Sequence, residues 1–214
     1  MKKILFLSVL LVSNVTNAEL NLDYRAYNTP VNYNFAEVEV GYKTYKADGN
    51  EDNMKVISIG SELMLNEKVI MKYSFSGEEI NDLAKILTLN MGLLYRISLA
   101  EKVDVVLGGE VAFDWLALEG TDTDTDTDTD TDYSYDNYDI GAHLGLRYGF
   151  TDNVEGVTQV IISDSSSYSL ITTLVTTKLS YYVTKNVGVG AFYTAGFNDK
   201  FDSTYAGANI KVRF

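Results

Sequence analysis

Alternation between apolar and polar residues is the feature of this chain that most restricts its fold. The last ten residues carry an apolar or small side chain at every second position up to Phe214, the final residue. A period of two places alternate side chains on opposite faces of an extended strand. The pattern therefore predicts a strand with one apolar and one mixed polar face, and Ile210, Val212 and Phe214 lie on the apolar face.

Ten segments of the sequence show this period of two. In residues 103–115, the clearest case, Val105 and Leu107 share one face, whereas Asp104 and Glu110 share the other. The mean hydropathy of the chain is −0.05, as expected when an apolar and a polar face average out. The predicted strands are residues 33–46, 55–65, 68–78, 86–97, 103–115, 138–150, 154–163, 169–183, 187–197 and 204–214.

Two-faced strands of this kind fit a sheet that borders lipid on its outside and water on its inside. In lipid every backbone polar group must find a partner, and among sheets only a closed barrel provides one. We therefore predict an all-β fold, a transmembrane antiparallel up-and-down β-barrel of about ten strands. Residues 19–27 also alternate, so a count between eight and twelve stays open. The alternative is a soluble β-sandwich whose aromatic residues form the core.

The first 18 residues have the pattern of a secretory signal peptide. Lys2 and Lys3 precede an apolar stretch at residues 4–12, and Thr16 and Ala18 are small residues before a cleavage point. The apolar stretch is far shorter than the ~20 residues that a transmembrane helix needs. We expect a signal peptide at 1–18, a periplasmic N-terminal segment at 19–32 and the barrel at 33–214.

Composition argues against several classes of function. The chain carries a net charge of −13, which disfavours nucleic acid as a partner. It has no cysteine and a single histidine, so a disulfide framework, thiol chemistry and a classical zinc site are not expected. We predict neither a metal nor a cofactor.

Short and long connections alternate between the predicted strands. If the last strand runs toward the periplasm, the periplasmic turns are residues 66–67, 100–101, 151–153 and 185–186. The opposite connections, at residues 47–54, 79–85, 116–137, 164–168 and 198–203, are longer or more variable. Short turns at one end and longer loops at the other are usual for transmembrane β-barrels, so we place the longer loops outside the cell.

The leader, the alternating segments and the final aromatic residue together resemble the small outer-membrane β-barrels of bacteria, including the opacity-type and outer-membrane-protein-A-type barrels. The resemblance covers nearly the whole chain after residue 18. It implies the outer membrane of a diderm, Gram-negative-type bacterium, with membrane lipid and lipopolysaccharide as surroundings. It also implies insertion by the barrel-assembly machinery, with Ile210, Val212 and Phe214 as the assembly signal. The resemblance is architectural and implies no active-site residue.

Charged residues on the predicted inward faces suggest ion pairs inside the barrel. Three pairs of opposite charge lie equidistant from the middle of a short turn, so we expect each pair to be directly opposed across a hairpin. In a confined interior each partner would offset the desolvation of the other. The pairs are Glu62 with Lys72, Arg96 with Asp104, and Arg147 with Glu155. Inward charges of the two signs are nearly balanced, which favours a filled lumen over a charge-selective pore.

A threonine-aspartate repeat occupies the longest predicted loop, residues 116–137. The dipeptide occurs six times from Thr121 to Asp132. Its repelling charges and small apolar area do not offset the entropy of ordering, so we expect an extended outer loop. This loop is either a contact or cation-binding element or a solvated insertion without a partner. The repeated acidic residues are Asp122, Asp124, Asp126, Asp128, Asp130 and Asp132.

Catalysis is not expected from this sequence. His143 falls on an inward face with Asp139 four residues away, about 13 Å along a strand and too far for a hydrogen bond. No nucleophile motif accompanies the histidine. Two hypotheses remain: a structural or surface-contact (adhesin-like) barrel, with possible contact to a host cell or matrix, and a narrow porin for small solutes. A barrel of about ten strands leaves at most a narrow passage, which favours the first.

Overall fold

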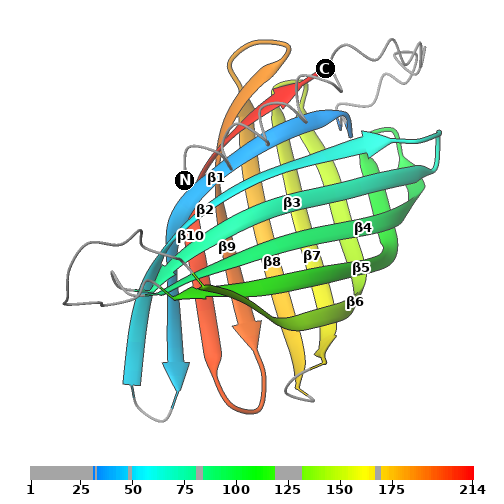
Figure 1. The fold of residues 1–214 in the computed structure, drawn as a ribbon. Coiled ribbons are helices and arrows are strands. Elements are labelled where there is room, and N and C mark those ends of the chain that lie inside the picture. The colour runs from blue at the N-terminus through cyan, green and yellow to red at the C-terminus, as the bar shows by residue number, and fades with distance from the viewer. Residues whose placement is uncertain (1–30, 32, 48–49, 81–83, 119–131, 167–169) are drawn as a thin grey trace.

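The computed structural model describes residue 31 and residues 33–214, apart from 48–49, 81–83, 119–131 and 167–169. Each strand pairs antiparallel with its sequence neighbours, and β1 pairs with β10 to close the barrel (Figure 1). The strands are β1 (Phe35–Ala47), β2 (Asn50–Met64), β3 (Val69–Ile80), β4 (Ala84–Ala100), β5 (Val103–Leu118), β6 (Asp132–Thr151), β7 (Val154–Ser165), β8 (Ile171–Tyr182), β9 (Val187–Phe197) and β10 (Asp202–Arg213). The predicted up-and-down barrel is confirmed, with ten strands in the described part of the chain. Within the same residues, no helix is long and apolar enough to cross a membrane.

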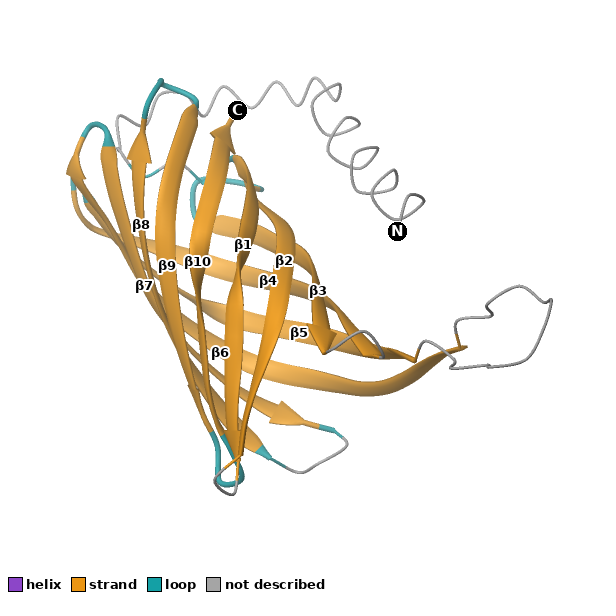
Figure 2. Cartoon of the chain, turned by 90° about the vertical axis from the view of Figure 1, so that its left-hand side faces the viewer, coloured by secondary structure: helices purple, strands orange, loops and turns teal. Residues whose placement is uncertain are grey.

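The two ends of the barrel differ in how the strands are joined. At one end, called the turn end here, β2 and β3, β4 and β5, β6 and β7, and β8 and β9 are connected by two to four residues each. Polar side chains fold these turns: Asn66 Oδ1 accepts a hydrogen bond from the backbone of Val69 at 2.9 Å, and Thr184 Oγ1 accepts one from Val187 at 3.0 Å. The C-terminus lies at this end, and the remaining connections form the opposite, loop end (Figure 2).

Several strands reach further toward the loop end than predicted. β1 and β2 leave only residues 48–49 between them, where residues 47–54 were predicted as a loop. β5 continues to Leu118 and β6 begins at Asp132, which pairs with Leu118, so the predicted loop 116–137 was too long. Antiparallel pairing satisfies backbone groups even where the side chains no longer alternate. The repeat from residue 121 to 131 lies outside the described residues.

Two β-bulges change the expected pairing at the turn end. A shift between Ser98 and Ala100 places Ser98 opposite Asp104, where Arg96 was expected. A second shift, next to Thr151, places Gly149 opposite Glu155, where Arg147 was expected. Each bulge inserts an unpaired residue into one strand and moves the register beyond it. Of the three predicted pairs, only Glu62 and Lys72 are directly opposed.

The alternating faces separate apolar from charged side chains across the barrel wall. Large apolar residues point outward, for example Leu144 and Ile210, which are 56% and 55% exposed. Charged residues point inward, where Arg147 and Glu155 are 2% and 1% exposed. A soluble protein has the opposite arrangement, so the β-sandwich alternative is wrong.

Two glycines face each other where the barrel closes. Gly41 of β1 is the register partner of Gly207 of β10. A Cβ atom at Gly41 would collide with the Ala206 carbonyl oxygen, and one at Gly207 would collide with that of Val40. The absence of side chains at this point allows the first and last strands to approach closely.

Candidate functional site: the barrel lumen

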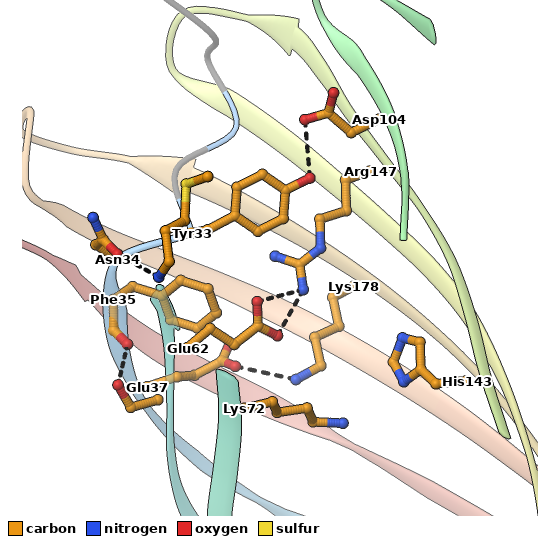
Figure 3. A network of polar contacts seen from close by, with 12 residues as sticks. Tyr33, Asn34, Phe35, Glu37, Glu62, Lys72, Asp104, His143, Arg147 and Lys178 are labelled. Atoms are coloured by element: carbon orange, nitrogen blue, oxygen red, sulfur yellow. Dashed lines mark hydrogen bonds and ion pairs between the residues drawn. The ribbon is translucent and has the colours of Figure 1, made fainter. Parts of the chain in front are cut away.

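A cluster of buried side chains occupies the lumen at the turn end (Figure 3). This turn-end cluster consists of Tyr33, Glu62, Arg96, Asp104 and Arg147. Tyr33 precedes β1, is 1% exposed, and donates its hydroxyl proton to Asp104 Oδ2 at 2.9 Å. Burial raises the pKa of Tyr33, so the hydroxyl keeps the proton that it donates.

Both arginines of the turn-end cluster bind a carboxylate and stack near the same aromatic ring. Arg96 donates from Nε and Nη2 to the two oxygens of Asp104, at 2.8 and 3.1 Å. Arg147 Nη2 lies 2.6 Å from both oxygens of Glu62. The guanidinium of Arg147 is 4.6 Å from the centre of the Tyr33 ring, and that of Arg96 is 5.4 Å away. Charge-assisted hydrogen bonds and cation–π contacts therefore offset the desolvation of both cations.

Another carboxylate at the same end, that of Glu155, binds two cations from β10. Glu155 accepts hydrogen bonds from Lys211 at 2.8 Å, from Arg213 at 2.9 Å and from the Tyr182 hydroxyl at 3.1 Å. Its side chain is 1% exposed. The contact links β7 to β10, which are not neighbours in the barrel.

The structure reassigns most partners of the six predicted ion-pair residues. Arg96 and Asp104 bind each other, as diagonal rather than opposed neighbours. Glu62 binds Arg147, and its register partner Lys72 binds Glu110 at 3.3 Å. Other partners thus replace two expected pairs, Glu62 with Lys72 and Arg147 with Glu155. The reason is that inward side chains of a narrow barrel reach across the lumen. Four additional partners in these contacts were not predicted: Tyr33, Tyr182, Lys211 and Arg213. For Tyr33 the sequence contains one signal, because its odd number places it on the same inward face as Phe35 and Glu37.

Apolar residues complete the closure of the turn end. Tyr33 packs in a buried cluster with Val31, Met64, Ile70, Leu94 and Val106. The segment is also held through its backbone, because Asn34 Oδ1 accepts a hydrogen bond from Met64 N at 2.8 Å. Val31, predicted within the periplasmic segment 19–32, is 2% exposed and belongs to this cluster. The predicted signal peptide and residues 19–30 lie outside the described residues.

Two cavities follow along the lumen. The middle cavity has a volume of about 150 Å³ and is lined on one side by Glu37, Glu39 and Lys178. Lys178 binds both carboxylates, with Glu37 Oε2 at 3.1 Å, and Asn209 also donates to Glu37. The second cavity, of about 420 Å³, lies toward the loop end and is called the loop-end cavity.

His143 is buried rather than placed in either cavity. Its side chain is fully buried, and its Nδ1 lies 3.5 Å from Glu110 Oε2. Asp139, four residues away, accepts a hydrogen bond from Asn137 at 2.7 Å. Within the described residues, no group of three or more histidine, aspartate or glutamate side chains is arranged to hold a metal ion.

The residues expected to direct assembly lie on the outer surface. Ile210, Val212 and Phe214 are 55%, 42% and 43% exposed. Of the repeated aspartates, Asp132 begins β6, and Asp122, Asp124, Asp126, Asp128 and Asp130 lie outside the described residues.

An apolar exterior around a charged interior requires lipid on the outside, and a closed ladder of strands satisfies the backbone there. The chain is a membrane-spanning β-barrel. No protein-family model and no curated protein matches its sequence.

Solved structures with a similar fold include several membrane barrels. Neisserial surface protein A is 12% identical, with a TM-score of 0.47 over 84% of this chain and 96% of that one. The translocator domain of the autotransporter NalP from Neisseria meningitidis is 9% identical, with a TM-score of 0.49 over 97% and 98%. The outer membrane protease OmpT from Escherichia coli is 10% identical, with a TM-score of 0.44 over 87% and 98%.

Proposed function

We propose that this outer-membrane barrel is non-catalytic and acts by surface contact at its loop end, without conducting solutes. The observation that carries this proposal is the filled turn end, where Arg147 contacts both Tyr33 and Glu62 inside the lumen and the three residues are 2%, 1% and 6% exposed. Ions crossing the lumen would have to separate buried, hydrogen-bonded charges there, which is costly. The role of such a barrel falls to its exterior and to its loops.

The loop end supplies the contact surface in this proposal. We place the loop end at the cell exterior, and the sequence that joins β5 to β6 carries the negatively charged repeat. The contact partners are a host or matrix surface and lipopolysaccharide, and the terminal face of Ile210, Val212 and Phe214 is recognised by the barrel-assembly machinery during insertion. The buried position of His143 against Glu110 supports a role without catalysis.

Planar-bilayer recording tests the absence of conduction. The purified, folded barrel should add no stable openings at concentrations where a reference porin conducts. Stable openings of uniform size from the native protein would contradict the proposal. Binding of the folded protein to host cells or matrix, lost when the repeat is removed, would support the contact role.

A narrow porin is the second candidate, and one observation favours it. Tyr33 belongs to a segment before β1, so its displacement from the lumen breaks no strand pairing. Replacing Tyr33 by alanine removes the ring between Arg96 and Arg147. Openings in this variant but not in Tyr42→Ala, whose side chain is 64% exposed on the outer face of β1, would identify the segment as the closure of a pore.

A further inference from the structure

The loop-end cavity has the size of a small-molecule site. Its volume is about 420 Å³, and ligand pockets commonly measure ~300–1,000 Å³. Asn198 and Phe201, in the connection between β9 and β10, line it toward the loop end, and Asn90 and Glu110 line it toward the middle of the barrel. We propose that this cavity binds a small polyhydroxylated amine of the amino-sugar class.

The charges that line the cavity are not balanced. Lys43 is its one basic lining residue, and Lys43 is bound to Glu78 at 2.7 Å. Asp114 accepts a hydrogen bond from the Thr88 hydroxyl at 2.6 Å, and Asp139 accepts one from the Asn137 amide at 2.7 Å. These donors are neutral, and neither aspartate forms a salt bridge with a cation of the described residues, because Lys43, whose charge acts on Asp114, is bound to Glu78. A ligand ammonium would supply the missing positive charge.

The two aspartates are positioned to share one ammonium group. Asp114 on β5 is directly opposite Asn137 on β6, and Asp139 lies two residues further along β6 on the same inward face. Diagonal neighbours of this kind have Cα atoms roughly 7–8 Å apart, within joint reach of one group. An ammonium has three donors and no acceptor, so it can bind both carboxylates at once.

The rest of the lining favours hydroxyl groups on the ligand. Ser76, Ser163 and Ser203 line the cavity, and their hydroxyls make no side-chain hydrogen bond to other described residues. Each hydroxyl can both donate and accept. Tyr45 and Phe201 pack edge to face at 5.5 Å on the same wall and offer apolar surface for the carbon skeleton of a sugar ring.

This inference deepens the proposed function, because it assigns a ligand class to the loop end. Only its biological setting rests on the proposed function, in which the loop end faces the cell exterior. Binding to the purified barrel does not depend on whether the barrel conducts. Failure of binding and failure of the closed-lumen proposal are therefore separate results.

Titration calorimetry on the full folded barrel in detergent tests the site with three probes: glucosamine, N-acetylglucosamine and ethanolamine. N-acetylglucosamine keeps the ring and lacks the charge, whereas ethanolamine keeps the charge and lacks the ring. Glucosamine should bind saturably and at least about tenfold more tightly than either control, the difference expected for one charge-assisted hydrogen bond. Asp114→Asn and Asp139→Asn should each weaken glucosamine binding by about the same factor.

Asp164→Asn is the matched control, because Asp164 lies beside Ile140 on the outer face, at the height of Asp139. This variant should bind glucosamine as the native protein does, and heat-modifiable migration in gels shows that all variants fold. Absence of saturable glucosamine binding would overturn the proposal. Equal binding of ethanolamine would overturn the assignment to a sugar, and an equal loss in Asp164→Asn would show a nonspecific charge effect and overturn the site.

Discussion

Arg147 on β6 crosses the lumen to bind Glu62 on β2, and one guanidinium nitrogen lies 2.6 Å from both carboxylate oxygens. The two strands are not neighbours in the barrel. The contact therefore joins opposite parts of the wall, and it predicts an energetic coupling that the hairpin register alone does not suggest.

Replacing Arg147 by alanine should lower the free energy of unfolding by about 3–5 kcal/mol, because Glu62 is then left as an unpaired buried charge. Replacing Glu62 by glutamine in the same variant should recover part of this loss. The measurement is a double-mutant cycle from unfolding in detergent and denaturant. A stronger coupling of Glu62 to its register partner Lys72 would contradict the contact across the lumen.

Reversing one charge of the Arg96 and Asp104 pair should also destabilise the barrel. Arg96→Glu places a like charge beside a buried carboxylate and should cost about 1–4 kcal/mol. The exchange Arg96→Asp with Asp104→Arg should restore part of this stability. Lys102→Glu is the control, because the pair of Lys102 with Asp152 is exposed and such pairs contribute only about 0–1 kcal/mol.

The sequence predicts the strands well because the two faces of each strand contact different media. The alternation of side chains along each strand is enough to assign Glu62 to the inside of the barrel and Leu144 to the outside. The alternation does not show the bulges near Ser98 and Thr151, each of which moves the register by one residue. The actual register partners of Asp104 and Glu155 lie two residues away from the expected ones.

Partner choice inside the lumen depends on the diameter and strand tilt of the closed barrel. No short-range pattern reveals that Arg147 binds Glu62, or that Glu155 binds Lys211. Odd numbering places Tyr33 on the inward face, but its contacts with Arg96, Asp104 and Arg147 could not be predicted, because these residues come from strands far away in the sequence.

Deleting Phe214 should reduce the amount of barrel assembled in the outer membrane more than deleting residues 19–30. The terminal face is outward and exposed, where an assembly factor can bind it. The comparison uses membrane fractionation and heat-modifiable gel migration. Phe150→Ala is the control, since Phe150 is a similarly exposed aromatic residue elsewhere. Equal assembly after both deletions would contradict the assigned role of the terminal residue.

Excising residues 121–130 should leave folding and stability nearly unchanged. The excision removes five of the repeated aspartates and stops short of β6, which begins at Asp132. Changing loop length costs only about 0.6 kcal/mol per doubling. An epitope tag inserted there should bind antibody on intact cells. Detection only after the outer membrane is permeabilised would place the repeat in the periplasm and invert the orientation.

The ion pairs across the lumen have a consequence for the order of folding events. Glu37 contacts Lys178 and Asn209, which are 141 and 172 residues away in the chain. Such contacts form only once β1 and β10 have met, so they belong to the last stage of folding. Interactions absent from the transition state slow unfolding with little effect on the folding rate. The charged interior should thus mainly lower the unfolding rate and so extend the lifetime of the barrel after it has closed.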